Sequence, residues 1–240
     1  MDDLRNRLIV ALDVESLAQA ERLLDRLQGV TSFFKVGAQL FTAAGPAAVE
    51  LIQKRGGRVF LDLKYHDIPN TVTGAVKEAT RLGVAMLTLH ASGGSAMLAA
   101  AARAAETAAR EFNVAKPLCL AVTVLTSLDR ATLQRELNVP LSVEGHVLHL
   151  AQLAKTAGAD GSVAAPQEIR ALRRALGQDW VLVAPGVRPA GSEAGDQARV
   201  ATPEAALKAG AHYLVVGRPI TGAPDPARAA LTILEEMARA

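Results

Sequence analysis

The stretch that decides the fold is Val59-Phe60-Leu61-Asp62-Leu63-Lys64-Tyr65-His66-Asp67-Ile68-Pro69-Asn70-Thr71. It begins as an apolar run typical of a buried strand and ends as a polar loop leading into a helix. Asp62 and Lys64 are two residues apart, so on a strand their side chains share a face and can pair. Unpaired charges in an apolar strand are costly to desolvate. These charges either tether a solvated loop or belong to a functional site, and the rest of the chain has to distinguish the two.

Short apolar runs alternate with longer helical patterns along the 240 residues. Ser16 is a candidate N-cap of the first helix. The expected strands cover residues 8–12, 33–36, 59–63, 86–89, 118–124, 161–163, 181–184 and 213–216. The later helices are expected at 45–55, 71–82, 94–111, 142–157, 167–176, 202–209 and 226–238. Eight strand–helix units without a linker predict an α/β fold, a single (β/α)₈ TIM barrel over residues 1–240, with a doubly wound open sheet as the alternative.

Two segments are longer than ordinary connections between a strand and a helix. Residues 125–141 are expected to hold a short extra helix. Residues 186–200 are rich in Gly, Ala and Ser, and long loops of this kind often act as lids over a site.

Composition excludes several classes of function. The 26 basic and 24 acidic side chains give a net charge of +2, without a basic block or a basic stripe interleaved with aromatics, so no nucleic-acid partner is expected. The first apolar run is too short for a signal peptide or a membrane span, which predicts a cytoplasmic protein without a membrane partner. The single Cys119 lies in an apolar run and is expected in the core, and Cys and His do not cluster at zinc spacing, so no metal is expected.

Polar residues follow most of the expected strands, and in a barrel these strand ends meet at one face. They are Asp13, Lys35, Asp62, Lys64, His90, residues 123–127, Gly186, Arg188, Gly217 and Arg218. Their recurrence on several strands predicts a site rather than isolated loop charges. Arg188 and Arg218 follow strands seven and eight, where such barrels often bind a phosphate. His90 is expected to cap a layer of the barrel rather than to take part in chemistry.

Lys64 has two possible roles at a strand end, a Schiff-base nucleophile or a proton donor. A Schiff-base lysine must lose its charge, whereas the carboxylates of Asp62 and Asp67 favour the charged form. The sequence therefore favours a cationic proton donor beside fixed carboxylates. This arrangement suits a carbanion intermediate. Because the sequence has neither a metal constellation nor a dinucleotide fingerprint, a reaction without a cofactor is expected.

The residues 62–71, Asp-Leu-Lys-Tyr-His-Asp-Ile-Pro-Asn-Thr, closely resemble the active-site signature of orotidine 5′-phosphate decarboxylases. The resemblance extends over essentially the whole chain. It is carried further by Val-Ala-Leu-Asp at 10–13, Lys-Val-Gly at 35–37, His-Ala-Ser-Gly-Gly at 90–94, Val-Thr-Val-Leu-Thr-Ser at 122–127, Pro-Gly-Val-Arg-Pro at 185–189, Gly-Asp-Gln at 195–197 and Val-Val-Gly-Arg-Pro-Ile at 215–220.

The resemblance implies a homodimeric barrel without a cofactor that decarboxylates orotidine 5′-phosphate to UMP, the last step of de novo UMP synthesis. It implies that Lys64 protonates the carbon that CO₂ leaves, within a catalytic charge network of Lys35, Asp62, Lys64 and Asp67. Asp67 and Thr71 would come from the other subunit. The implied substrate-binding residues are Asp13 and Lys35 for the ribose, Asp62, Ile68 and Thr71, Thr126 for the pyrimidine with Ser127 as a less certain neighbour, and Arg188, Gln197, Gly217 and Arg218 for the phosphate.

One segment departs from the family pattern, and two alternatives stay open. Ala164-Ala165 stand where relatives often have Cys-Ser, which puts the packing of strand six in doubt. A Mg²⁺-dependent sugar-phosphate lyase or synthase of the same barrel superfamily would share the Asp-x-Lys strand and the phosphate end. A non-catalytic barrel that binds a phosphorylated ligand would be expected to lack Lys64 or one of the acids, and all are present.

Overall fold

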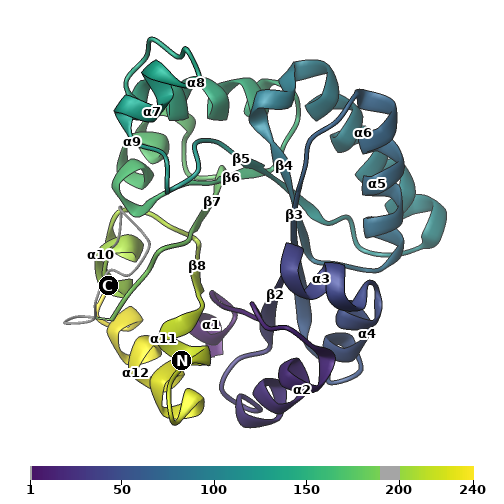
Figure 1. Ribbon diagram of the computed structural model, residues 1–240, viewed down its shortest axis with the longest axis vertical. Helices are drawn as coiled ribbons and strands as arrows, with labels where there is room; N and C mark the ends of the chain where they lie inside the picture. The colour runs from purple at the N-terminus through teal and green to yellow at the C-terminus, as the bar shows by residue number, and fades with distance from the viewer. Residues whose placement is uncertain (1, 190–200) are drawn as a thin grey trace.

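The chain folds into a closed barrel of eight parallel strands, ordered around the barrel as in the sequence. The structure is a computed structural model, and it describes residues 2–189 and 201–240. In Figure 1 the helices form an outer ring around the strands. The (β/α)₈ prediction is confirmed and the open-sheet alternative is wrong, because β8 pairs with β1. The strands are β1 (Leu8–Ala11), β2 (Phe33–Gly37), β3 (Arg58–Tyr65), β4 (Met86–His90), β5 (Leu118–Val122), β6 (Gly161–Val163), β7 (Val181–Ala184) and β8 (Tyr213–Val216).

Several helices begin where the sequence supplies a side-chain cap. Ser16, Ser142 and Thr202 each accept a backbone N–H bond at the start of a helix. The expected helix at 45–55 is shorter, and a separate helix, α3, precedes it. Helix α3 begins directly after Gly37, which provides no side-chain cap. Within the described residues no helix is long and apolar enough to cross a membrane. The helices are α1 (Asp2–Arg5), α2 (Leu17–Arg26), α3 (Ala38–Ala44), α4 (Ala47–Gln53), α5 (Pro69–Arg81), η1 (Ala91–Gly93), α6 (Gly94–Phe112), α7 (Arg130–Arg135), α8 (Val143–Thr156), α9 (Pro166–Leu176), α10 (Pro203–Lys208), α11 (Arg218–Thr221) and α12 (Pro226–Met237).

Apolar side chains fill the barrel interior below the polar strand ends, on the side where the strands begin. Ile9, Phe33, Phe60 and Met86 belong to one buried cluster there. Because side chains on a strand alternate between the two faces, the next inward position lies two residues further along. On β2 and β3 this position holds Lys35 and Asp62, so the polar layer lies directly above an apolar floor.

The core is closely packed at Cys119 and at Ala164–Ala165. Cys119 is fully buried, and burial raises the pKa of its thiol to about 12. Ala164 and Ala165 are also buried, and the Ala164 N–H donates to the carbonyl of Val183 at 3.2 Å. The departure from the family pattern therefore leaves strand six paired and packed.

Strand β3 is irregular at the residues of greatest interest. The register between β3 and β4 shifts between Leu61 and Tyr65, and Lys64 has a φ of +51°. The strand geometry that the sequence predicts is therefore irregular at Lys64, but the predicted pairing of the Asp62 and Lys64 side chains is confirmed. Non-glycine residues rarely adopt this left-handed conformation, and they do so mainly where the surrounding structure holds them in it.

Candidate active site

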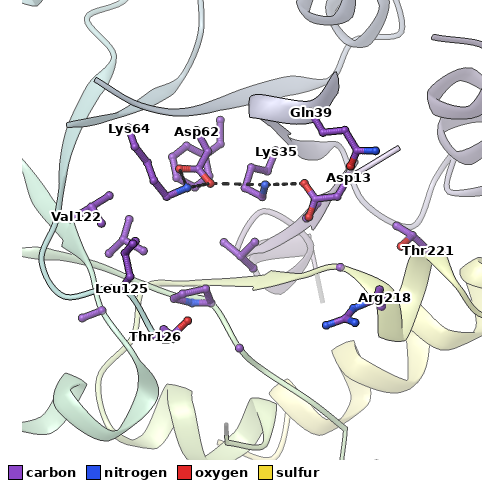
Figure 2. Close-up of a pocket in the computed structure, with 18 of the residues that line it drawn as sticks. Asp13, Lys35, Gln39, Asp62, Lys64, Val122, Leu125, Thr126, Arg218 and Thr221 are labelled. Carbon is purple, nitrogen blue, oxygen red and sulfur yellow. Dashed lines mark hydrogen bonds and ion pairs between the residues drawn. The ribbon is translucent and has the colours of Figure 1, made fainter. Parts of the chain in front are cut away.

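A row of alternating charges crosses the open end of the barrel (Figure 2). Lys64 Nζ lies 2.9 Å from both carboxylate oxygens of Asp62. Lys35 Nζ lies 3.6 Å from the other side of the same carboxylate, at Asp62 Oδ2, and 2.9 Å from Asp13 Oδ1. The residues come from β3, from β2 and from the loop after β1, so the pairing of these three neighbouring strands brings them together.

Asp62 is held as a charged group. Burial of its carboxylate acts to raise the pKa, but the positive charges of Lys35 and Lys64 act against it. Hydrogen bonds from Lys64 and Thr88 act in the same direction as these charges, and the pKa lies below its ordinary value. The carboxylate therefore stays ionised at neutral pH in a largely buried position.

The row of charges forms one wall of a cavity of about 490 Å³, within the usual size range for small-molecule sites. Val122, Val124, Val163 and Val215 contribute apolar surface, and Thr126 contributes a hydroxyl. Among the described residues no group of three or more His, Cys, Asp or Glu side chains is placed to hold a metal ion. The lining of the cavity therefore has two parts, the row of charged side chains and an apolar wall.

Two arginines lie at the other end of the cavity. Arg188 follows β7 and Arg218 begins α11 directly after β8, and both line the cavity with Gly186 and Gly217. Burial, and then the nearby charge of Arg218, lowers the pKa of Arg188. An anion between two guanidinium groups offsets their mutual repulsion, and a guanidinium can bind a phosphate through two parallel hydrogen bonds. In Figure 2 Arg218 lies at the opposite end of the pocket from Lys64.

The chain matches proteins of known name over nearly its whole length. The model of the orotidine 5′-phosphate decarboxylase / HUMPS family matches residues 6–233. The chain belongs to this family. Orotidine 5′-phosphate decarboxylase of Moorella thermoacetica is 57% identical over 97% of this chain and 92% of its own length. The enzyme of the same name from Syntrophotalea carbinolica is 53% identical over 98% and 96% of the two chains.

A solved structure of an orotidine 5′-phosphate decarboxylase has the same fold as this chain. The crystal structure of orotidine 5′-phosphate decarboxylase from Lactobacillus acidophilus superposes with a TM-score of 0.86 and is 39% identical. The match covers 97% of this chain and 99% of the other.

Not all residues expected in an orotidine 5′-phosphate decarboxylase site meet in one chain. Asp67, Ile68 and Thr71 are exposed and do not line the cavity, and the Asp67 carboxylate accepts a hydrogen bond from the Ile68 N–H at 2.6 Å. Ser127 is exposed and does not line the cavity either. Gln197 and most of the expected lid lie outside the described residues.

The sequence did not point to three residues that affect the cavity, which are Gln39, Thr221 and Gly37. Gln39 and Thr221 line it from α3 and α11. At Gly37 a Cβ atom would lie 2.8 Å from Lys35 Nζ and 3.2 Å from Asp13 Oδ1, so any side chain would displace the charged row. The signal was available, because a glycine inside a strand often marks a close approach.

His90 lies beside the site without lining the cavity. Its ring centroid is 5.5 Å from that of His66. Burial, followed by the charges of His66 and Lys64, lowers the pKa of His90, although Asp62 acts in the opposite direction. The ring is therefore neutral at neutral pH, and its role as a cap of a barrel layer stays a prediction.

Proposed function

We propose that this protein decarboxylates orotidine 5′-phosphate to UMP and CO₂, as a lyase without a cofactor in the last step of de novo UMP synthesis. Family membership and the names of relatives such as that from Moorella thermoacetica support the reaction. The observation that carries the mechanism is the Lys64 ammonium, 2.9 Å from both oxygens of an ionised Asp62 in a cavity with apolar walls.

In this mechanism the bond between C6 of the pyrimidine and its carboxylate breaks, CO₂ leaves, and the electron pair stays on C6. Such a carbanion is very poorly stabilised in water, so the site has to supply a large electrostatic stabilisation. Lys64 lies where that negative charge develops, and its Nζ proton then moves to C6. Asp62 keeps Lys64 oriented and lies against the departing carboxylate, which it repels.

The rest of the substrate occupies the cavity between its two ends. Asp13 and Lys35, which form an ion pair at 2.9 Å, are assigned to the ribose hydroxyls. Thr126 is assigned to the pyrimidine edge, and Gly217 and Arg188 to the phosphate. We extend the same assignment to Gln197 from the family resemblance alone. Because the phosphate is remote from C6, its binding energy can order the site for the reaction.

The proposed active form is a homodimer in which Asp67, Ile68 and Thr71 reach the partner's cavity. In the single chain residues 66–71 are all exposed, and Ile68 is 66% exposed despite its apolar side chain. A second copy would bury this segment and extend the charged row with Asp67. The homodimer and the cytoplasmic location stay predictions.

The direct test of the function is the loss of orotidine 5′-phosphate absorbance with purified protein in excess EDTA. We expect rapid conversion to UMP, which would also exclude an essential exchangeable metal. No conversion by folded protein would contradict the proposal. Pentulose and hexulose phosphates with added Mg²⁺ would then test the sugar-phosphate alternative, and binding without turnover would favour a non-catalytic barrel.

Replacing Arg218 with alanine tests the phosphate end. Charge-assisted hydrogen bonds contribute roughly 1.5–3 kcal/mol each, so KM for orotidine 5′-phosphate should rise about 10- to 100-fold. The control substrate is orotidine, which lacks the phosphate and should be turned over equally slowly by the wild type and the variant. An unchanged KM for the phosphorylated substrate would move the phosphate site elsewhere.

A further inference from the structure

Thr88 on β4 is a buried polar residue that connects two residues of the charged row. Its side chain is fully buried. Its hydroxyl donates a hydrogen bond to Asp62 Oδ1 at 3.0 Å and accepts one from the Lys64 backbone N–H at 2.9 Å. A hydroxyl has one proton to donate and lone pairs to accept, so both bonds form at once. One side chain thereby holds the carboxylate of Asp62 and the main chain of Lys64.

The two bonds lie where β3 departs from regular geometry. A register shift removes ladder hydrogen bonds and leaves backbone groups that need other partners. Lys64 lies inside this shift with its φ of +51°, and pairing with β4 resumes at Tyr65 opposite Leu89, next to Thr88. The Thr88 hydroxyl therefore supplies the acceptor for Lys64 that the ladder does not.

We propose that Thr88 is a positioning residue for the decarboxylation. Its hydroxyl fixes the Asp62 carboxylate relative to the Lys64 backbone, and so holds the Lys64 ammonium at one place in the cavity. This inference rests on the proposed function of Lys64 and Asp62. Displacement of a reacting group by about 1 Å can lower a rate by about 100-fold, so a residue that touches no substrate can still control the rate.

The test compares three variants at this position. Thr88→Val keeps the shape but leaves the Lys64 N–H without its acceptor and puts a methyl group against Asp62. We expect kcat to fall about 10- to 100-fold, while KM and UMP binding change less than about 3-fold, because the phosphate end is intact. Thr88→Ser keeps the hydroxyl and should restore kcat to within about 3-fold of the wild type. Thr88→Ala removes the hydroxyl without adding a methyl and serves if the valine variant does not fold.

Thr80→Val is the matched control. Thr80 is also fully buried, but it lies on α5, outside the cavity, and its hydroxyl donates to the carbonyl of Val76 at 2.8 Å. This variant should keep the wild-type kcat. The proposal is overturned if Thr88→Val and Thr80→Val have the same kcat, or if Thr88→Ser loses as much activity as Thr88→Val.

A second readout does not depend on the reaction. Amide hydrogen exchange of Lys64, followed by NMR, should accelerate at least about 10-fold in Thr88→Val and remain unchanged in Thr80→Val. Unchanged exchange in a folded Thr88→Val protein would show that Thr88 does not hold Lys64. If the wild type does not convert orotidine 5′-phosphate, the proposed function fails and Thr88 has no reaction to serve, while exchange still decides whether it holds Lys64.

Discussion

Replacing Lys64 with alanine is expected to lower kcat for orotidine 5′-phosphate by at least about 10⁴-fold. The change removes the proton donor, a contribution of roughly 10²–10⁴-fold, and also the positive charge beside the developing carbanion. The measurement is UMP formation at high protein concentration over long incubations, so that small residual rates are seen. Activity within tenfold of the wild type would remove Lys64 from the mechanism.

The fold of this variant should persist, because Asp62 keeps two of its partners. Lys35 Nζ remains 3.6 Å from Asp62 Oδ2, and the Thr88 hydroxyl still donates to Oδ1, so no uncompensated buried charge is left. Retained UMP binding and an unchanged circular dichroism spectrum would confirm this. Lys64→Gly is a second inactive variant with less backbone strain, since glycine adopts a positive φ readily. Lys54→Ala is the control, because the Lys54 side chain is 76% exposed.

The parts of the site that the sequence predicted depend on local spacing and on the general geometry of barrels. Asp62 and Lys64 are close in sequence, so their ion pair could be expected without knowing the fold. Lys35 lies near the end of an apolar strand, and Arg188 and Arg218 follow two others. Because parallel strands of a barrel end at one face, the three residues could be assigned to the same cavity.

The features that the sequence did not predict depend on contacts between segments that are distant in the sequence. Thr88 looks like an ordinary β-branched strand residue, and its role arises only from the register of β4 against β3. The irregularity at Lys64 is equally invisible, because a lysine carries no preference for positive φ. Helix α3 begins without a side-chain cap at Gly37, so no start signal separates it from β2. In the proposed homodimer Asp67 and Thr71 reach the cavity of a second chain, and no pattern within one chain describes such a contact.

Pairing two inactive protomers should restore activity if Asp67 acts across the dimer. Asp67 is exposed in the single chain and does not line the cavity that holds Lys64. Asp67→Ala alone should lower kcat at least about 100-fold, because the charged row loses the carboxylate that the partner's Asp67 adds to it. In a heterodimer of Lys64→Ala with Asp67→Ala, shared sites would place both changes in one cavity and leave the other cavity intact. Such a heterodimer, isolated with two different affinity tags, should have about half of the wild-type activity per dimer.

The mirror experiment uses the same two substitutions in the opposite arrangement. A heterodimer of the wild type with the double variant Lys64→Ala/Asp67→Ala carries one change in each cavity if the sites are shared, so it should be inactive. If each cavity used only its own chain, the two results would be exchanged, because the wild-type protomer would keep its site and the first heterodimer would have none. Tagged wild-type dimers control for the tags. Since both heterodimers contain the same residues, only the route by which Asp67 reaches Lys64 can make their activities differ.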